Sequence, residues 1–354
     1  MPVTEAQVME ALRSVHDPDL HLDVVTLGFV KDLKIEGGKV GVTLELTTPA
    51  CPVRELLKSQ AEEAISAVEG VGAVEVSMTA KVRDRKTKPE DLLPGVKHVI
   101  AVASGKGGVG KSTVTVNLAV ALAASGARVG ILDADVYGPS IPMMMGCSDE
   151  RPYTEGAKII PIERFGLELM SIGFLLEEGQ AVLWRGPMVA GTVKQLLEDV
   201  AWGELDYLLV DLPPGTGDAP MSLAQLAPLT GVVIVTTPHN VAANIAGKSV
   251  QLFRRLNSPI LGVVENMAAF VDPETGKETR IFSGMSGMDL AQALQVPYLG
   301  SVPLDPGISQ AGDQGVPPVL AQPSSRQAQD FKMIAGKLAQ QCSILSLKKP
   351  EPGA

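Results

Sequence analysis

Eight consecutive residues, Gly105 to Ser112, have the types and the spacing of a phosphate-binding loop. They read Gly-Lys-Gly-Gly-Val-Gly-Lys-Ser and fit the pattern G-x-x-x-x-G-K-[ST]. The apolar residues 99–103 come before the loop and predict a buried strand, and residues 112–122 follow it with apolar side chains at helical spacing. A strand, a glycine-rich loop and a helix in this order form the context in which such a loop binds phosphate.

The residue types in this loop account for phosphate binding. Glycines allow successive backbone N–H groups to turn inward around an anion, and the following helix adds the positive end of its dipole. We expect Lys111 to reach the β- and γ-phosphates of a nucleotide and the Ser112 hydroxyl to bind Mg²⁺. The residues expected around the nucleotide phosphates are Gly105, Lys106, Gly107, Gly108, Val109, Gly110, Lys111, Ser112 and Thr113.

Three carboxylates follow predicted strands elsewhere in the chain. Asp133 and Asp135 come directly after one apolar run, and Asp211 ends another. An aspartate at the end of an apolar strand near a phosphate loop holds Mg²⁺ directly or through water, so Asp211 is a predicted magnesium ligand. Asp135, with Asp133 beside it, is placed to order a water or a metal-bound water. In the turn after Asp211, we expect Gly215 to bring its N–H against the γ-phosphate.

Composition limits the class of protein. The chain has 354 residues, of which 45% are apolar, enough for two domains with a sizeable core. The net charge of -10 leaves no cationic surplus to release counterions, which predicts no nucleic-acid partner. No apolar run has membrane-spanning length and no signal-peptide pattern is present, so we expect a cytoplasmic protein with no membrane partner. The three widely spaced cysteines predict no disulfide framework.

The hydrophobic pattern predicts the domain organisation. The predicted parts are a small α/β domain, a charged linker, a domain with the phosphate loop, and a disordered tail, at residues 1–82, 83–96, 97–345 and 346–354. In the larger domain, continuous apolar strands alternate with helices, the last of them over residues 324–340. Strands of this kind are typical of a parallel sheet covered on both faces. We therefore expect a doubly wound, mostly parallel α/β sheet that binds its ligand at the carboxyl ends of the strands.

Three further motifs, taken with the phosphate loop, give the chain a specific resemblance. Residues 132–140 read Leu-Asp-Ala-Asp-Val-Tyr-Gly-Pro-Ser, and residues 211–218 read Asp-Leu-Pro-Pro-Gly-Thr-Gly-Asp. Residues 184–188 read Trp-Arg-Gly-Pro-Met. Together with Lys106 in the loop, these motifs resemble the Mrp/ApbC family of P-loop ATPases with a deviant Walker A loop. Its members are described as carriers that bind and transfer iron–sulfur clusters.

The resemblance implies an activity and the roles of single residues. It implies that a homodimer binds and slowly hydrolyses ATP and passes clusters to apo iron–sulfur proteins or assembly factors. Lys106, Lys111, Asp135 and Asp211 would be the catalytic residues. Among them, Lys106 would cross the dimer interface to the other nucleotide, Asp135 would position the attacking water, and Asp211 would serve Mg²⁺. Asn266, in the element Glu-Asn-Met, would hydrogen-bond the adenine.

The chain departs from the family pattern at the expected cluster ligands. Members typically carry Cys-x-x-Cys after the Glu-Asn-Met element, so that two subunits supply four thiolates to one [4Fe–4S] cluster. This chain has Asp272 and Thr275 at those positions, whereas cluster irons strongly prefer thiolates. A second hypothesis is therefore a nucleotide-switched scaffold or targeting ATPase without a cluster. A third is a spatial-positioning ATPase like those of septum placement or DNA partition, although the small first domain is foreign to that group.

One cysteine in the first domain is the remaining candidate cluster ligand. Residues 17–19 and 47–52 of this domain resemble a small domain shared with iron–sulfur assembly factors. Cys51 precedes a proline at a predicted helix start, where the helix dipole would lower the pKa of a thiol. It could equally be a buried small apolar residue. Cys147 and Cys342 are expected to be structural.

Overall fold

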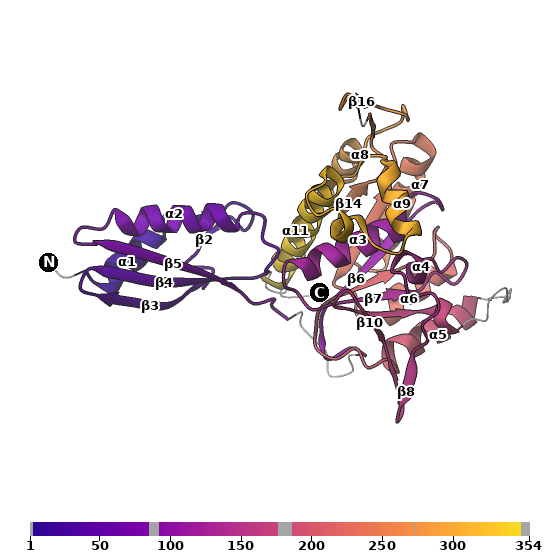
Figure 1. Cartoon of the computed structure of the whole chain (residues 1–354), viewed down its shortest axis with the longest axis horizontal. Helices are drawn as coiled ribbons and strands as arrows, with labels where there is room; N and C mark the ends of the chain where they lie inside the picture. The colour runs from indigo at the N-terminus through magenta and orange to yellow at the C-terminus, as the bar shows by residue number, and fades with distance from the viewer. Residues whose placement is uncertain (1–2, 85–91, 176–185, 273, 348–354) are drawn as a thin grey trace. The chain divides into compact units, whose positions relative to one another are not determined.

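The chain divides into two compact units, which are described separately (Figure 1). The computed structural model describes residues 3–84, 92–175, 186–272 and 274–347. The first unit comprises residues 1–83 and 339–354, and the second comprises residues 84–338. Parts of the predicted linker and tail, and the start of the Trp-Arg-Gly-Pro-Met motif, lie outside the described residues. They are residues 85–91, 348–354 and 184–185.

The first unit packs helices against a three-stranded sheet in the order β3–β4–β5. Strand β3 is antiparallel to β4, and β4 is parallel to β5 because helix α2 makes the crossover between them. In β4 the alternate residues Val40, Val42, Leu44 and Leu46 are buried, as the period-two pattern predicts. The elements are α1 (Glu5–Leu12), β1 (His16–Asp17), β2 (Leu22–Asp23), β3 (Val30–Glu36), β4 (Lys39–Leu46), α2 (Arg54–Ser66) and β5 (Ala73–Ala80).

The second unit is built on an eight-stranded sheet in the order β10–β11–β7–β12–β6–β13–β14–β17. Neighbouring strands are parallel except for the edge pair β10 and β11. The strands are β6 (Val96–Ser104), β7 (Val129–Asp133), β10 (Ile162–Arg164), β11 (Leu167–Ser171), β12 (Leu205–Asp211), β13 (Gly231–Thr236), β14 (Ile260–Glu265) and β17 (Tyr298–Ser301). Strands β6, β7, β12, β13 and β14 contain the apolar runs at residues 99–103, 129–132, 207–210, 232–235 and 260–264, which predict buried strands.

The connections wind this sheet in both directions from β6. The chain first moves outward to β7 and β11, then returns through β12 and crosses to β13, β14 and β17. Because such crossovers are right-handed, helix α3 after β6 and helix α7 after β13 lie on opposite faces of the sheet, and helices cover both faces (Figure 1). The predicted doubly wound α/β fold is therefore confirmed.

Helices and short hairpins complete the second unit. Its helical elements are α3 (Lys111–Ala124), α4 (Ile141–Met144), η1 (Ile172–Leu175), α5 (Gly186–Glu198), α6 (Asp218–Leu226), α7 (Asn240–Arg255), α8 (Gly287–Leu294), α9 (Pro306–Asp313), α10 (Pro318–Ala321) and the start of α11 (Arg326–Leu347). Outside the large sheet, two hairpins among the described residues pair β8 (Tyr153–Glu155) with β9 (Lys158–Ile160), and β15 (Phe270–Val271) with β16 (Glu278–Thr279).

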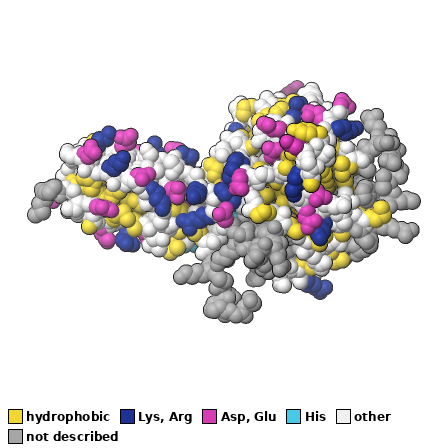
Figure 2. All heavy atoms as spheres, turned by 90° about the horizontal axis from the view of Figure 1, so that it is seen from below, with side chains coloured by type: hydrophobic (Ala, Val, Ile, Leu, Met, Phe, Trp, Pro, Cys, Tyr) yellow, Lys and Arg dark blue, Asp and Glu magenta, His cyan; other side chains and the backbone are white. Residues whose placement is uncertain are grey.

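Helix α11 is longer than predicted. It runs to Leu347 rather than to residue 340, because Cys342 and Ser343 are buried and continue its packed face. Its residues from 339 onward belong to the first unit, although the sequence analysis assigned residues up to 345 to the larger domain. No helix among the described residues is both long and apolar enough to cross a membrane. On the face shown in Figure 2, basic and acidic side chains are interspersed.

Candidate functional site

The glycine-rich loop lies between the end of β6 at Ser104 and the start of α3 at Lys111. Gly108 and Gly110 have φ angles of +77° and +81°, a left-handed backbone that favours glycine. Gly110 has a second reason to lack a side chain, since a Cβ atom there would meet the side-chain amide of Asn266. The strand, loop and helix predicted around this motif are thus present.

Lys111 points into a group of carboxylates beneath the loop. Its Nζ lies 2.6 Å from Oδ2 of Asp211 and 3.4 Å from Oδ2 of Asp135. The Lys111 side chain is 5% exposed, and that of Asp211 is fully buried. Asp211 is the last residue of β12, which runs beside β6 and so ends next to the loop. The ammonium that would bind phosphates is therefore held by two carboxylates.

Two hydroxyl groups of α3 also bind the Asp211 carboxylate. The Ser112 hydroxyl donates to Oδ2 at 2.6 Å, and the Thr115 hydroxyl donates to Oδ1 at 2.7 Å. The loop motif predicts Ser112 at this position but does not include Thr115. The signal was available, because Thr115 lies four residues after Lys111 and therefore on the same face of the helix. The hydroxyl and carboxylate oxygens that meet at this point are the hard donors that suit Mg²⁺.

Asp133 lies beside Asp211 in the sheet but makes different contacts. The two aspartates are register partners at the ends of β7 and β12. Asp133 accepts hydrogen bonds from the Ser171 hydroxyl at 2.9 Å and from the backbone N–H of Asp135 at 3.2 Å. Burial, with the nearby charge of Asp211, raises the pKa of Asp133 to about 7. The structure thus brings Asp133, Asp135 and Asp211 to one edge of the sheet, as predicted.

Of two other groups predicted to contact phosphates, one is exposed and the other is already hydrogen-bonded within the chain. Lys106 is exposed at the outer side of the loop. The backbone N–H of Gly215, expected against the γ-phosphate, instead donates to the carbonyl oxygen of Ser104 at 2.8 Å. Contact of this N–H with a phosphate would therefore require the turn after Asp211 to move.

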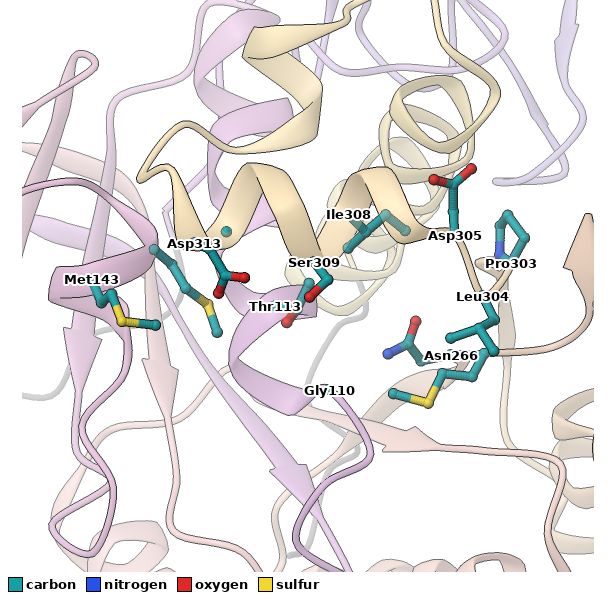
Figure 3. Close-up of a pocket in the computed structure, with 13 residues that line it drawn as sticks. Gly110, Thr113, Met143, Asn266, Pro303, Leu304, Asp305, Ile308, Ser309 and Asp313 are labelled. Atoms are coloured by element: carbon teal, nitrogen blue, oxygen red, sulfur yellow. The ribbon is translucent and has the colours of Figure 1, made fainter. Parts of the chain in front are cut away.

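A cavity of about 220 Å³ opens beside the loop at the start of α3 (Figure 3). Asn266, just beyond β14, lies at this cavity, and its Nδ2 donates to the carbonyl oxygen of Val109 at 2.9 Å. Asn266 thus joins the loop to the cavity wall. The cavity is lined by Gly110, Thr113, Met143, Met144, Asn266, Met267, Pro303, Leu304, Asp305, Ile308, Ser309, Gly312 and Asp313.

Two family models match this chain. A family model described as NUBPL iron-transfer P-loop NTPase matches residues 95–339. The chain belongs to this P-loop NTPase family. A second model, described as iron–sulfur cluster assembly protein, matches residues 5–77. Both parts of the resemblance drawn from the sequence motifs are therefore confirmed.

Relatives match this P-loop NTPase over nearly its whole length. The iron–sulfur cluster carrier protein of Deinococcus radiodurans is 47% identical over 343 residues, which cover 97% of this chain and 97% of that protein. A protein of the same name from Synechocystis sp. is 44% identical over 351 residues, covering 98% and 99%. The chloroplastic Fe–S cluster assembly factor HCF101 of Arabidopsis thaliana is 45% identical over 350 residues, covering 96% of this chain and 64% of that protein.

Two solved structures resemble about two thirds of this chain. The nucleotide-binding protein of Archaeoglobus fulgidus in complex with ADP is 41% identical, with a TM-score of 0.58, over 65% of this chain and 92% of that chain. The cell division ATPase MinD of Pyrococcus furiosus is 23% identical, with a TM-score of 0.50, over 68% of this chain and 98% of that chain. The second likeness shows the fold only.

In this NTPase the two residues at the expected cluster positions form a tight turn. The Asp272 carboxylate accepts hydrogen bonds from the backbone N–H groups of Glu274 at 2.9 Å and Thr275 at 2.8 Å. These bonds, led by the one from Thr275, lower the pKa of Asp272. The Thr275 hydroxyl in turn accepts from the backbone N–H of Lys277 at 3.3 Å. Both side chains thus stabilise the turn between β15 and β16.

The expectation of a lowered thiol pKa at Cys51 is wrong. Helix α2 begins at Arg54, so Cys51 lies in the turn before the helix rather than in its first turn. Burial raises the pKa of Cys51 to about 11, and the charges of Asp17 and Asp19 act in the same direction. The thiol is half-buried, whereas Cys147 and Cys342 are buried. Among the residues that the structure describes, no group of three or more His, Cys, Asp or Glu could hold a metal ion.

Proposed function

We propose that this chain is an ATP-hydrolysing carrier of iron–sulfur clusters that acts as a nucleotide-switched homodimer in the cytoplasm. The observation that carries the nucleotide part is the convergence of Lys111, Ser112 and Asp211 directly beneath the glycine loop. The carrier part is supported by relatives named iron–sulfur cluster carrier protein that match the chain from end to end.

The chain's own groups divide the work of hydrolysis. When ATP enters, Lys111 leaves Asp211 for the β- and γ-phosphates, and the loop N–H groups bind the remaining phosphate oxygens. Ser112 and Asp211 would hold Mg²⁺, with Asp135 reaching it through water, and the ion would neutralise charge on the phosphates. The backbone N–H of Tyr137 donates to Oδ1 of Asp135 at 3.3 Å, which holds this carboxylate to orient the attacking water.

Exposed groups beside the loop support a homodimer. Gly105 packs against α7, because a Cβ atom there would lie 2.7 Å from the backbone of Ile245. Val241 lies one turn before Ile245 in α7, and its side chain is 51% exposed. Met285 lies next to this turn, because its backbone N–H donates to the side-chain oxygen of Asn240. An exposed lysine, Lys106, and exposed apolar side chains therefore share one face. This arrangement suits a two-fold symmetric dimer, in which each subunit inserts its own Lys106 into the site of the other.

The cluster site proposed for this chain lies at Cys51. With Asp272 and Thr275 used in a turn, Cys51 is the most accessible thiol that the chain offers. We propose that Cys51 of each subunit is one of the ligands of a cluster shared by the dimer, and that binding of iron displaces the thiol proton that burial retains. The alternative, which the Asp272 turn favours, is a nucleotide-switched scaffold or targeting ATPase without a cluster.

Anaerobic reconstitution with iron and sulfide tests carriage. The absorption spectrum and the iron content per dimer would be measured for the wild-type protein, for Cys51→Ala and for the matched control Cys147→Ala. A cluster lost only in Cys51→Ala, and passed by the wild type to an apo iron–sulfur protein, would support the carrier. No cluster in any of the three proteins, with ATP hydrolysis retained, would leave the scaffold alternative.

A further inference from the structure

Two helices that line the cavity end in glycines that face each other. Helix α4 is followed by Gly146 with a φ of +63°, and α9 is followed by Gly315 with a φ of +71°. The N–H of Gly146 donates to the carbonyl of Met143 at 3.0 Å, and that of Gly315 donates to the carbonyl of Gly312 at 3.2 Å. Each glycine therefore closes its helix in the left-handed conformation common at helix ends.

The backbones of these glycines touch, so a side chain at Gly315 has no room and one at Gly146 is crowded. A Cβ atom on Gly315 would lie 2.7 Å from the nitrogen of Gly146 and 3.2 Å from the carbonyl oxygen of Met143. A Cβ atom on Gly146 would lie 3.0 Å from the carbonyl oxygen of Gly315. Real Cβ atoms do not come as close as the 2.7 Å between the Cβ position on Gly315 and the nitrogen of Gly146. The atoms around this position belong to the backbone and cannot rotate away.

The same two helices both line the cavity. Helix α4 contributes Met143 and Met144, and α9 contributes Ile308, among others (Figure 3). The two helices approach each other at Gly312 of α9 and Met144 of α4. A Cβ atom on Gly312 would lie 3.9 Å from Cγ of Met144, which is ordinary van der Waals contact. A flat aromatic base gains most when apolar groups contact both of its faces, so the separation of these helices decides how well it is held.

We propose that the contact between Gly146 and Gly315 is a positioning device that sets the width of the cavity for the base of the nucleotide. This inference rests on the proposed nucleotide-binding function. The phosphate loop holds the other end of the same ligand, so widening the cavity weakens recognition of the base and leaves recognition of the phosphates intact. The glycines act through the helices that they join and do not touch the nucleotide.

Binding of ATP and of inorganic triphosphate, a ligand without a base, separates these contributions. The variants are Gly315→Ala, the milder Gly146→Ala, and the control Gly156→Ala. Gly156 lies between β8 and β9 with a φ of +61° and has nothing within 4 Å of a Cβ atom, so it tests backbone strain without a clash. Thermal unfolding of each variant shows whether it remains folded.

We expect Gly315→Ala to bind ATP about tenfold more weakly and triphosphate as well as the wild type does, with a smaller loss for Gly146→Ala. Gly156→Ala should bind both ligands normally. Wild-type affinity for ATP in a folded Gly315→Ala protein would overturn the inference, as would equal losses for ATP and triphosphate in both cavity variants. If the wild-type protein bound neither ligand, the proposed function itself would fail, and this inference with it.

Discussion

The Nζ atom of Lys111 lies 2.6 Å from Oδ2 of Asp211, and both side chains are almost completely buried. This ion pair joins the phosphate loop to the strand end that would bind magnesium. Because a buried carboxylate without a compensating cation is costly, Lys111 stabilises the buried charge of Asp211. The same two residues are those proposed to bind the phosphates and Mg²⁺.

Removing Lys111 is expected to cost stability as well as nucleotide binding. Lys111→Met leaves Asp211 buried without its cation, which should lower the free energy of unfolding by about 3–5 kcal/mol. Urea unfolding without nucleotide measures this loss. The double variant Lys111→Met with Asp211→Asn should regain part of it, because no unpaired charge remains. If the losses of unfolding free energy from the two single substitutions added up in the double variant, the ion pair would not stabilise the protein.

The Thr115 hydroxyl is expected to matter because it binds the charged form of Asp211. Its oxygen lies 2.7 Å from Oδ1 of Asp211. Thr115→Val keeps the shape of the side chain but removes this bond, at a cost of about 1.5–3 kcal/mol in unfolding free energy. ATP turnover should also fall, since Asp211 loses one of the groups that orient it. Thr115→Ser keeps the hydroxyl and should restore both properties; equal effects of the two substitutions would assign Thr115 a packing role only.

Asp133 is expected to make the stability of the nucleotide-free protein depend on pH. Its folded pKa of about 7 lies above the ordinary value of 3.8, so the folded state holds the proton more tightly than the unfolded state. Stability from this group is therefore greatest at low pH and is lost as pH rises from about 4 to about 7. Asp133→Asn should remove that part of the slope.

Urea unfolding at about pH 5 and about pH 8 measures this dependence. The advantage of the wild type over Asp133→Asn should shrink between the two values. Ser171→Ala is a useful comparison, because it removes a hydrogen bond to Asp133 but leaves the titrating carboxyl in place. A constant difference between wild type and Asp133→Asn at both values would contradict the assignment.

Asn266 is expected to support nucleotide binding through its amide group. Asn266→Asp has nearly the same shape, but its carboxylate would face the carbonyl oxygen of Val109 instead of donating to it at 2.9 Å. The loop should then be displaced, and ATP affinity should fall by about tenfold or more, because a buried polar group is left unpaired. Calorimetric titration with ATP measures the change. Affinity equal to that of the wild type would remove Asn266 from the binding site.

Much of the fold could be predicted from the sequence, because the signals were local. The apolar runs gave the central strands of the larger sheet, and the loop motif fixed where β6 ends and α3 begins. Asp211 could be placed because parallel strands bring their carboxyl ends to one edge. These inferences need only periodicity and the rule of right-handed crossovers.

The features that the sequence could not predict depend on contacts between distant segments. Gly146 and Gly315 are separated by 169 positions in the sequence (315 − 146). Neither has a sequence signal beyond that of a glycine at the end of a helix. The pKa of Cys51 depends on burial and on where α2 begins, which the proline pattern misplaced by a turn. The N–H of Gly215 was unavailable because Ser104, on another segment, accepts it.

The most direct test of the central claim mixes two inactive variants. If Lys106 acts across a dimer interface, Lys106→Ala and Lys111→Ala should each lower ATP turnover by about a hundredfold or more. A mixed dimer would contain one complete site, in which the Lys106→Ala subunit binds the nucleotide and the other subunit supplies Lys106. Mixing equal amounts should restore turnover toward about a quarter of the wild-type rate, since about half of random dimers would be mixed. No recovery, with mixed dimers present by light scattering and tag pull-down, would contradict the nucleotide-switched homodimer.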